Sequence, residues 1–271
     1  MSDDLDSKHG VQSLEIGMGI LRAMMDGQRS MMLKDIAAAA DMPASKAHRY
    51  LVSLIRSGLV EQDRLTSRYD LGPFALNLGL VALDRVDRIR LGLSAIGDLR
   101  DLTNETVALA VWSDRGPVVV RWERPRRPIT VNVLTGTSLS LLSSAAGRVF
   151  AAWLPEQQTE ALLRAELESG RVPAGIATLD DARRLLAEVR ARGVAVISSG
   201  YFARGVEAAA APVFNFKNEI NMSIALVGVE GTLDLLPHSP VLQALKEACD
   251  ALSRRLGATL LPGVESGDHA T

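Results

Sequence analysis

The side chains best suited to chemistry in this sequence lie on a short helix predicted over residues 44–57. Apolar residues recur there at helical spacing and predict an inward face made by Ala47, Tyr50, Leu51 and Leu54. The opposite face carries hydroxyls, cations and an imidazole. Hydroxyls and cations suit phosphate oxygens, and an arginine suits a guanine edge in the major groove. We therefore predict DNA contacts from Ser45, Lys46, His48, Arg49 and Ser53.

The segments around this helix predict a winged helix-turn-helix. A first helix is indicated from Ser13, a candidate N-cap, to Gly27, with an apolar stripe of Val11, Leu14, Met18, Leu21 and Met25. A second, shorter helix ends before Pro43, which cannot continue the helical hydrogen bonds. Gly58 ends the third helix as its C-terminal cap.

Two extended segments, 59–62 and 68–71, predict a hairpin that would form the wing. The net charge of the whole chain is only −2, but the window from Arg29 to Tyr69 holds seven positive and four negative residues, a local charge of +3. Phosphate binding requires such a locally basic face. Flanking phosphate contacts are predicted from Arg29, Lys34, Arg64 and Arg68.

Length and composition predict two domains in the cytoplasm. A chain of 271 residues with 47% apolar content exceeds the usual single domain. The apolar runs are too short to cross a bilayer, and the N-terminus opens with acids instead of a targeting signal. The only cysteine, Cys249, excludes an internal disulfide and is predicted to be buried and inert. The predicted organisation is a tail over 1–10, a DNA-binding domain over 11–72, one or two linking helices over 73–102, a second domain over 85–262 and a tail over 263–271.

The second domain is predicted to mix strands and helices. Extended segments are predicted at 107–112, 118–122, 129–133, 194–198, 206–214 and 220–229, and helices at 144–154, 156–168, 179–192 and 240–256. These elements do not alternate strictly as βαβ units. The pattern therefore favours an α+β fold with a mixed or antiparallel sheet.

Catalytic chemistry is hard to assemble from this sequence. The histidines are His9, His48, His238 and His269, and no two stand at metal-ligand spacing. No nucleophile elbow of the form Gly-x-Ser-x-Gly and no phosphate loop is present. We predict no catalytic residue, no metal and no cofactor, so the protein is not expected to be an enzyme.

Several segments together resemble the isocitrate-lyase-regulator (IclR) family of transcriptional regulators. In the N-terminal part these are Val11-Gln12-Ser13-Leu14, residues 44–51 (ASKAHRYL), 57–61 (SGLVE) and 69–72 (YDLG). In the C-terminal part they are residues 104–107 (NETV), 143–148 (SSAAGR), 192–196 (RGVAV), 205–206 (GV) and 210–214 (AAPVF). Each motif alone is moderately specific, and their order and spacing over residues 11–261 carry the resemblance.

The resemblance implies a GAF-like effector-binding domain, dimers through the DNA-binding domains and tetramers, as dimers of dimers, through the effector domains. It implies that a small molecule lies against the loop Ser144–Gly147, which runs into a helix N-terminus and so suits a carboxylate. A plain helix cap is the alternative interpretation of that serine, and both can hold. The implied partners are operator DNA and a small organic effector. The predicted effector-binding residues are Leu142, Ser144, Ala145, Ala146, Gly147, Trp112, Ser198, Tyr201, Ala208, Ala225 and Val227.

The sequence departs from the family pattern mainly around the ligand. The family usually has a proline and often a histidine where this chain has Ser140 and Leu142, and a glutamate where it has Tyr201. Relatives that hold small hydrophilic acids have polar side chains at the positions of Ser198, Ala208, Ala225 and Val227. In this chain only Ser198 is polar. Apolar walls favour hydrocarbon, so we predict an effector with an aromatic or otherwise hydrophobic body. Trp112 and Trp122 are candidates for the wall, with burial in the core as the alternative.

Two other function classes stay open at this point. The protein could bind DNA without any ligand, as an architectural or partner-binding element, or its second domain could be catalytic. Saturable ligand binding to residues 85–271 would separate the first alternative from a sensor. Turnover of that ligand would favour the enzyme.

Overall fold

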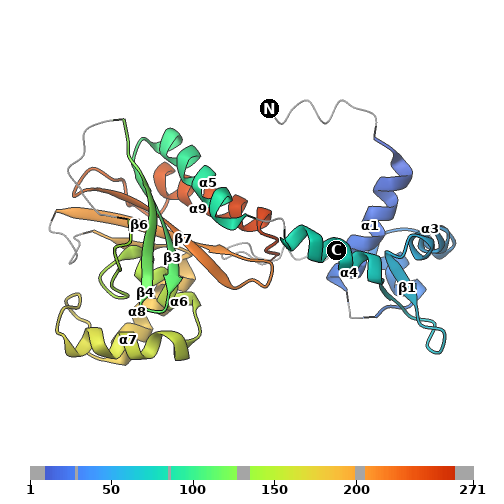
Figure 1. Ribbon diagram of the computed structural model, residues 1–271, viewed down its shortest axis with the longest axis horizontal. Coiled ribbons are helices and arrows are strands. Elements are labelled where there is room, and N and C mark those ends of the chain that lie inside the picture. The colour runs from blue at the N-terminus through green and yellow to red at the C-terminus, as the bar shows by residue number, and fades with distance from the viewer. Residues whose placement is uncertain (1–9, 28–29, 85–86, 127–134, 199–204, 260–271) are drawn as a thin grey trace. The chain divides into compact units, whose positions relative to one another are not determined.

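The computed structural model describes residues 10–27, 30–84, 87–126, 135–198 and 205–259 (Figure 1). The chain forms two compact units, residues 1–86 and 87–271. Within the described ranges, no helix combines the length and the hydropathy needed to span a membrane. The predicted strand at 129–133 lies outside the described residues.

The first unit is a winged helix-turn-helix, as the sequence predicted. Helices α1 (Gln12–Asp26), α2 (Leu33–Ala39) and α3 (Ala44–Arg56) enclose a core in which Ile20, Ile36 and Leu51 are fully buried. Strands β1 (Val60–Gln62) and β2 (Tyr69–Leu71) pair antiparallel to form the wing. Met31 adds a bridge to Tyr69, with backbone hydrogen bonds of 3.0 and 2.8 Å. This bridge ties the wing to the segment before α2.

The apolar stripe predicted for α1 is not its buried face. Val11, Leu14, Met18 and Met25 are exposed, whereas the buried residues of α1 are Gly17, Ile20 and Met24. Gly17 faces the Tyr50 ring of α3, with which an added Cβ would make an ordinary contact at 4.0 Å. The predicted N-cap is also wrong: Val11 holds that position, without a side-chain cap.

The segment between the units contains two helices. Helix α4 (Pro73–Asp84) belongs to the first unit, where the Phe74 N–H donates to the Gly58 carbonyl. Helix α5 (Arg88–Thr103) belongs to the second and begins at an Asp87 cap. The sequence predicted one or two linking helices, and the structure has two.

The second unit is built on a five-stranded antiparallel sheet in the order β4-β3-β7-β6-β5. Helices α5 and α9 cover one face, and α6, with α7 and α8 beyond it, lies on the other (Figure 1). The sheet consists of β3 (Thr106–Ser113), β4 (Gly116–Glu123), β5 (Ala195–Ile197), β6 (Val206–Phe214) and β7 (Ile220–Val229). The remaining helices are α6 (Ala145–Trp153), α7 (Glu156–Glu168), α8 (Leu179–Arg192) and α9 (Pro240–Arg255). The predicted α+β class is confirmed.

A row of alanines crosses the sheet beneath α6. The strand register aligns Ala108 of β3, Ala225 of β7, Ala210 of β6 and Ala195 of β5, all of them buried. Their single methyl groups leave room for a helix to lie close to the sheet. Larger side chains pack at one end of α6, where the Phe150 and Trp112 ring centroids are 5.8 Å apart.

Candidate DNA-binding and effector-binding sites

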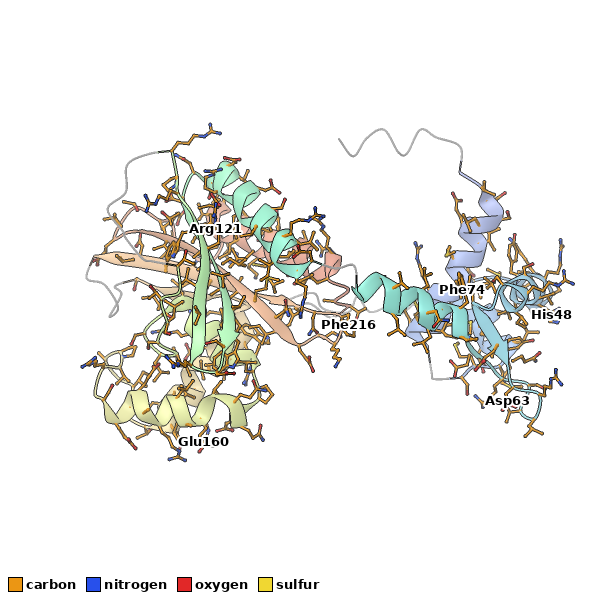
Figure 2. All side chains as sticks on the ribbon, viewed as in Figure 1. His48, Asp63, Phe74, Arg121, Glu160 and Phe216 are labelled. Atoms are coloured by element: carbon orange, nitrogen blue, oxygen red, sulfur yellow. The ribbon has the colours of Figure 1, made fainter. Side chains whose placement is uncertain are left out.

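Helix α3 has the two faces that the sequence predicted. Ala47, Leu51 and Leu54 are buried and Tyr50 is half-buried. Ser45, Lys46, His48, Arg49 and Ser53 are all exposed. In Figure 2, His48 projects from α3 away from the rest of its unit. The exposure of these five side chains leaves them available to a macromolecule, and their contact with DNA stays a prediction.

The wing is shaped by a carboxylate at its turn. Asp63 accepts hydrogen bonds from the Leu65 N–H and the Thr66 hydroxyl, both at 2.8 Å. These bonds, the Leu65 amide first, lower the pKa of the Asp63 carboxyl. The turn closes through Ser67, whose φ of 56° lies in the left-handed region. This local network shapes the turn that contains the exposed Arg64, next to Asp63 (labelled in Figure 2).

The other predicted phosphate-binding residues have different surroundings. Arg68 donates from Nη1 to the Ser30 carbonyl at 2.9 Å, so part of its guanidinium ties the wing to the segment before α2. Lys34 is exposed in the first turn of α2. Arg29 lies outside the described residues.

The sheet face beneath α6 brings together several predicted effector-binding residues. Val227 pairs with Ala208 across β7 and β6, and Ala225 lies two residues along on the same face. Arg148 of α6 donates from Nη1 to the Val196 carbonyl of β5 at 3.3 Å, so the end of its side chain reaches β5 two residues before Ser198. The tip of the Arg148 side chain and these strand positions therefore share one end of the sheet. The segment that leads into α6 begins at the other end, where the Leu139 N–H donates to the carbonyl of Pro117, the cross-strand partner of Trp112.

Trp112 does not join this group. It lies six residues along β3 from Thr106, the partner of Val227, which corresponds to about 20 Å of strand. Its ring packs on Phe150 in the core instead. Trp112 is partly exposed and packs against the core cluster, and its contact with an effector stays a prediction. Tyr201 lies outside the described residues.

The start of α6 is capped and tightly closed. Ser144 is the N-cap, and its hydroxyl accepts from the Gly147 N–H at 2.9 Å and donates to the Ser140 carbonyl at 2.6 Å. A Cβ on Gly147 would lie 1.9 Å from the Ser140 oxygen, so only glycine fits. The buried Ala145 and Ala146 occupy the first turn, where helical N–H groups have no intrahelical acceptor.

Glu166 of α7 is an important residue of this loop that the sequence analysis missed. Its carboxylate accepts from the Ser140 hydroxyl at 2.8 Å and from the Leu141 and Leu142 N–H groups at 2.6 and 3.0 Å. Two backbone donors of the loop are thus already bound to a carboxylate of the protein. Glutamates are common on exposed helices, so the sequence alone could not single this one out.

Arg148 is a second site residue that the sequence did not predict, although it belongs to the motif at residues 143–148. Its side chain is half-buried and donates to two backbone carbonyls, Leu142 at 2.7 Å and Val196 at 3.3 Å. Burial lowers the pKa of its guanidinium. Within the described residues no carboxylate pairs with it. A desolvated cation near the positive end of a helix is poorly compensated, which favours binding of an anion there.

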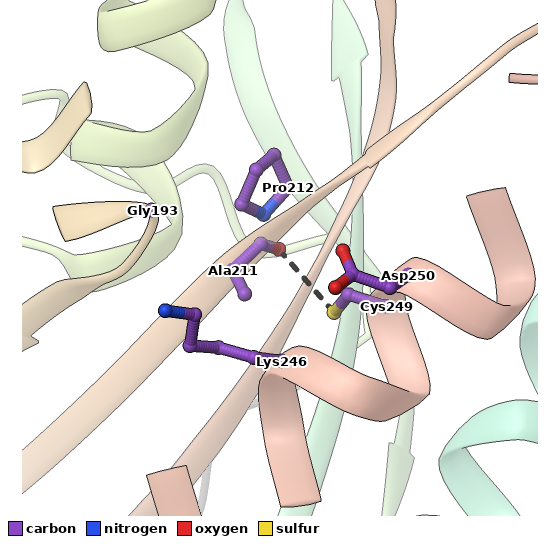
Figure 3. Close-up of a pocket in the computed structure, with 6 residues that line it drawn as sticks. All are labelled: Gly193, Ala211, Pro212, Lys246, Cys249 and Asp250. Atoms are coloured by element: carbon purple, nitrogen blue, oxygen red, sulfur yellow. Dashed lines mark hydrogen bonds between the residues drawn. The ribbon is translucent and has the colours of Figure 1, made fainter. Parts of the chain in front are cut away.

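The hollows described in the second unit lie on the opposite face of the sheet. One of about 10 Å³, lined by Lys246, Cys249 and Asp250 among others, is scarcely large enough for a water molecule (Figure 3). Cys249 is buried there, as predicted, with its thiol 3.7 Å from the Ala211 carbonyl, and burial raises its pKa. A surface groove of about 330 Å³ runs between α5 and α9. Neither hollow contains a predicted effector-binding residue.

Metal chemistry finds no support in the described ranges, where no three histidine, cysteine or acidic side chains are grouped closely enough to hold an ion. His48 and His238 stand in different units. A winged helix-turn-helix is an architecture of DNA-binding proteins.

Comparison with known proteins identifies the family. The family model described as "IclR helix-turn-helix domain" matches residues 13–64, and that described as "Bacterial transcriptional regulator IclR C-terminal" matches residues 81–254. The chain belongs to the IclR family of DNA-binding transcriptional regulators.

Relatives and solved structures match over nearly the whole chain. The glycerol operon regulatory protein of Streptomyces coelicolor is 30% identical over 260 residues, covering 92% of this chain and 97% of its own. The crystal structure of Pseudomonas aeruginosa HmgR is 39% identical with a TM-score of 0.79, covering 91% and 98%. An IclR homologue from Microbacterium hydrocarbonoxydans, solved in complex with 4-hydroxybenzoate, has the same fold at 20% identity, with a TM-score of 0.55 and coverage of 92% and 100%.

The close approach at Gly147 generates a stability prediction. Gly147→Ala should lower the free energy of unfolding by about 1–3 kcal/mol, because the new methyl group must displace the Ser140 backbone. The matched control is Gly97→Ala in α5, where an added Cβ meets nothing within 4 Å. That control should raise the unfolding free energy by up to about 1 kcal/mol, since alanine favours helix. Urea unfolding measures both, and equal effects would contradict the described loop geometry.

Proposed function

We propose that this protein regulates transcription in the cytoplasm by binding operator DNA through α3 and the wing. The observation that supports this most directly is the exposed set of α3, two cations, an imidazole and two hydroxyls, on a helix whose other face is buried. A helix of this size enters the major groove, where arginine recognises guanine. The wing cation Arg64 and the α2 cation Lys34 would hold flanking phosphates.

The DNA proposal predicts a specific role for Arg49. Arg49→Ala should weaken binding to the operator by about 1–3 kcal/mol and leave the weak affinity for random DNA, because a base contact is lost. The matched control is Arg56→Ala, seven residues further along α3 and also exposed. It should affect operator and random DNA alike. Fluorescence anisotropy with both DNAs measures this, and equal losses for Arg49→Ala would assign that residue to a phosphate instead.

We further propose that the protein is a homodimer through its first unit. Helix α4 is apolar on nearly all sides, yet Phe74, Leu76, Leu78, Leu80 and Val81 are exposed, as is the apolar stripe of α1. Helices of this composition are normally buried, and large exposed apolar surfaces mark association sites. A dimer would present two recognition helices to an operator with two half-sites. Association of dimers into a tetramer through the second unit is proposed from the family resemblance.

The dimer proposal is tested by placing a charge on α4. Leu78→Glu should convert the dimer to a monomer and lower operator affinity, because a buried carboxylate opposes association. Leu236→Glu, at a leucine that is 70% exposed in a loop of the second unit, is the matched control and should stay dimeric. Sedimentation velocity distinguishes the two. A Leu78→Glu protein that remains dimeric would overturn the α4 interface.

We propose that a small organic carboxylate controls DNA binding from the α6 face of the sheet. Arg148 and the first turn of α6 supply positive potential, and Ala208, Ala225 and Val227 supply apolar walls. An aromatic acid matches both features, and the 4-hydroxybenzoate complex of the Microbacterium hydrocarbonoxydans homologue suggests the probes. The effector would act by binding one arrangement of the dimer more tightly, which changes the spacing of the recognition helices.

Arg148 makes the effector proposal testable. The wild-type protein should bind benzoate more tightly than neutral benzamide, and Arg148→Met should remove that preference, about 1.5–3 kcal/mol for a charged hydrogen bond. Arg190→Met is the matched control, because Arg190 also donates to a backbone carbonyl of α6, that of Ala152. Calorimetric titration measures both probes. Benzamide binding shows that the variant is folded, and an unchanged preference for benzoate would contradict the role of Arg148.

A further inference from the structure

The indole nitrogen of Trp122 is a buried donor without an acceptor. Its Nε1 atom is shielded from solvent and has no hydrogen-bond partner in the part of the chain that the structure describes. Buried tryptophan N–H groups normally find an acceptor, since a desolvated donor that stays unpaired is costly. An unpaired donor in a native protein therefore suggests a binding partner for it.

Trp122 lies on the sheet face that carries the proposed effector site. On β4 it pairs with Ala108 of β3, which in turn pairs with Ala225 of β7. Its ring packs against the same core cluster as α6. Two strand spacings, about 10 Å, separate the Trp122 and Ala225 backbones, and the side chain between them is a single methyl group. The indole thus lies next to the alanine row, on the same sheet face as Ala225.

The other tryptophan of this sheet differs. Trp112 packs its ring on Phe150, and its nitrogen is not among the buried atoms without a partner. Among the described tryptophans, only Trp122 has a nitrogen that is both shielded from solvent and without a partner. This nitrogen belongs to the tryptophan nearest the alanine row.

We propose that Trp122 Nε1 donates a hydrogen bond to an oxygen of the effector that is remote from its carboxylate. This rests on the proposed effector site and narrows the effector class to acids that carry a second oxygen, such as a ring hydroxyl. A site that holds an unpaired buried donor discriminates against analogues without the acceptor. Because indole only donates, a methyl ether oxygen would serve as well as a hydroxyl if it fits.

The test compares acids that differ only in the second oxygen. The full-length protein is titrated with benzoate and with 2-, 3- and 4-hydroxybenzoate. The best hydroxybenzoate should bind about 2- to 10-fold more tightly than benzoate, the range of one neutral hydrogen bond. In Trp122→Phe that ratio should fall to about one while benzoate still binds. In Trp112→Phe, the matched control, the ratio should persist.

Each outcome separates this inference from the function on which it rests. A Trp122→Phe protein that keeps the hydroxyl preference overturns the inference and leaves the effector site standing. Failure of every acid to bind the wild-type protein overturns the proposed effector class itself. A measurement without a variant uses the indole N–H resonances of the three tryptophans. The Trp122 resonance should move downfield with the preferred hydroxybenzoate and not with benzoate, and a shift confined to Trp112 or Trp153 overturns the assignment.

Discussion

The close contact between α6 and the sheet is the constraint on which the second unit depends. It is possible because the strands place four alanines in register beneath the helix, and because Gly147 lets the helix start pass the Ser140 carbonyl. At that start the polar groups of loop and helix cannot reach solvent freely, so they must be satisfied internally. Ser144 caps the helix and Glu166 binds the loop amides, which fixes the loop before any ligand arrives.

Near the start of α6, the two charged side chains differ in their hydrogen-bond partners. The Glu166 carboxylate has three hydrogen-bond donors, whereas the Arg148 guanidinium has only backbone carbonyls. One residue, Leu142, joins the two, since its N–H binds Glu166 and its carbonyl binds Arg148. An anion that approached Arg148 would therefore act on the same peptide segment that Glu166 holds.

In the first unit, by contrast, apolar side chains remain exposed on the surface. Its core includes Ile20, Ile36 and Leu51, whereas Leu14 and Met18 of α1 and Phe74, Leu76, Leu78, Leu80 and Val81 of α4 are exposed. Exposed apolar residues gathered on two helices mark an association surface, and a second copy would cover it under the proposed dimer. Dimerisation of this kind would also fix the distance between two α3 helices, which DNA recognition requires.

The sequence by itself determined the order of the elements, the two faces of α3, the α+β class and the family, because helical periodicity, glycine and proline breaks and short motifs are local signals. Only the tertiary structure decided which apolar stripe of α1 is buried, since both faces of that helix are apolar. It also separated Trp112 from Val227 and brought Glu166, Arg148 and Trp122 to the α6 face. Strand register and helix packing join residues far apart in the chain, and no local pattern encodes those distances.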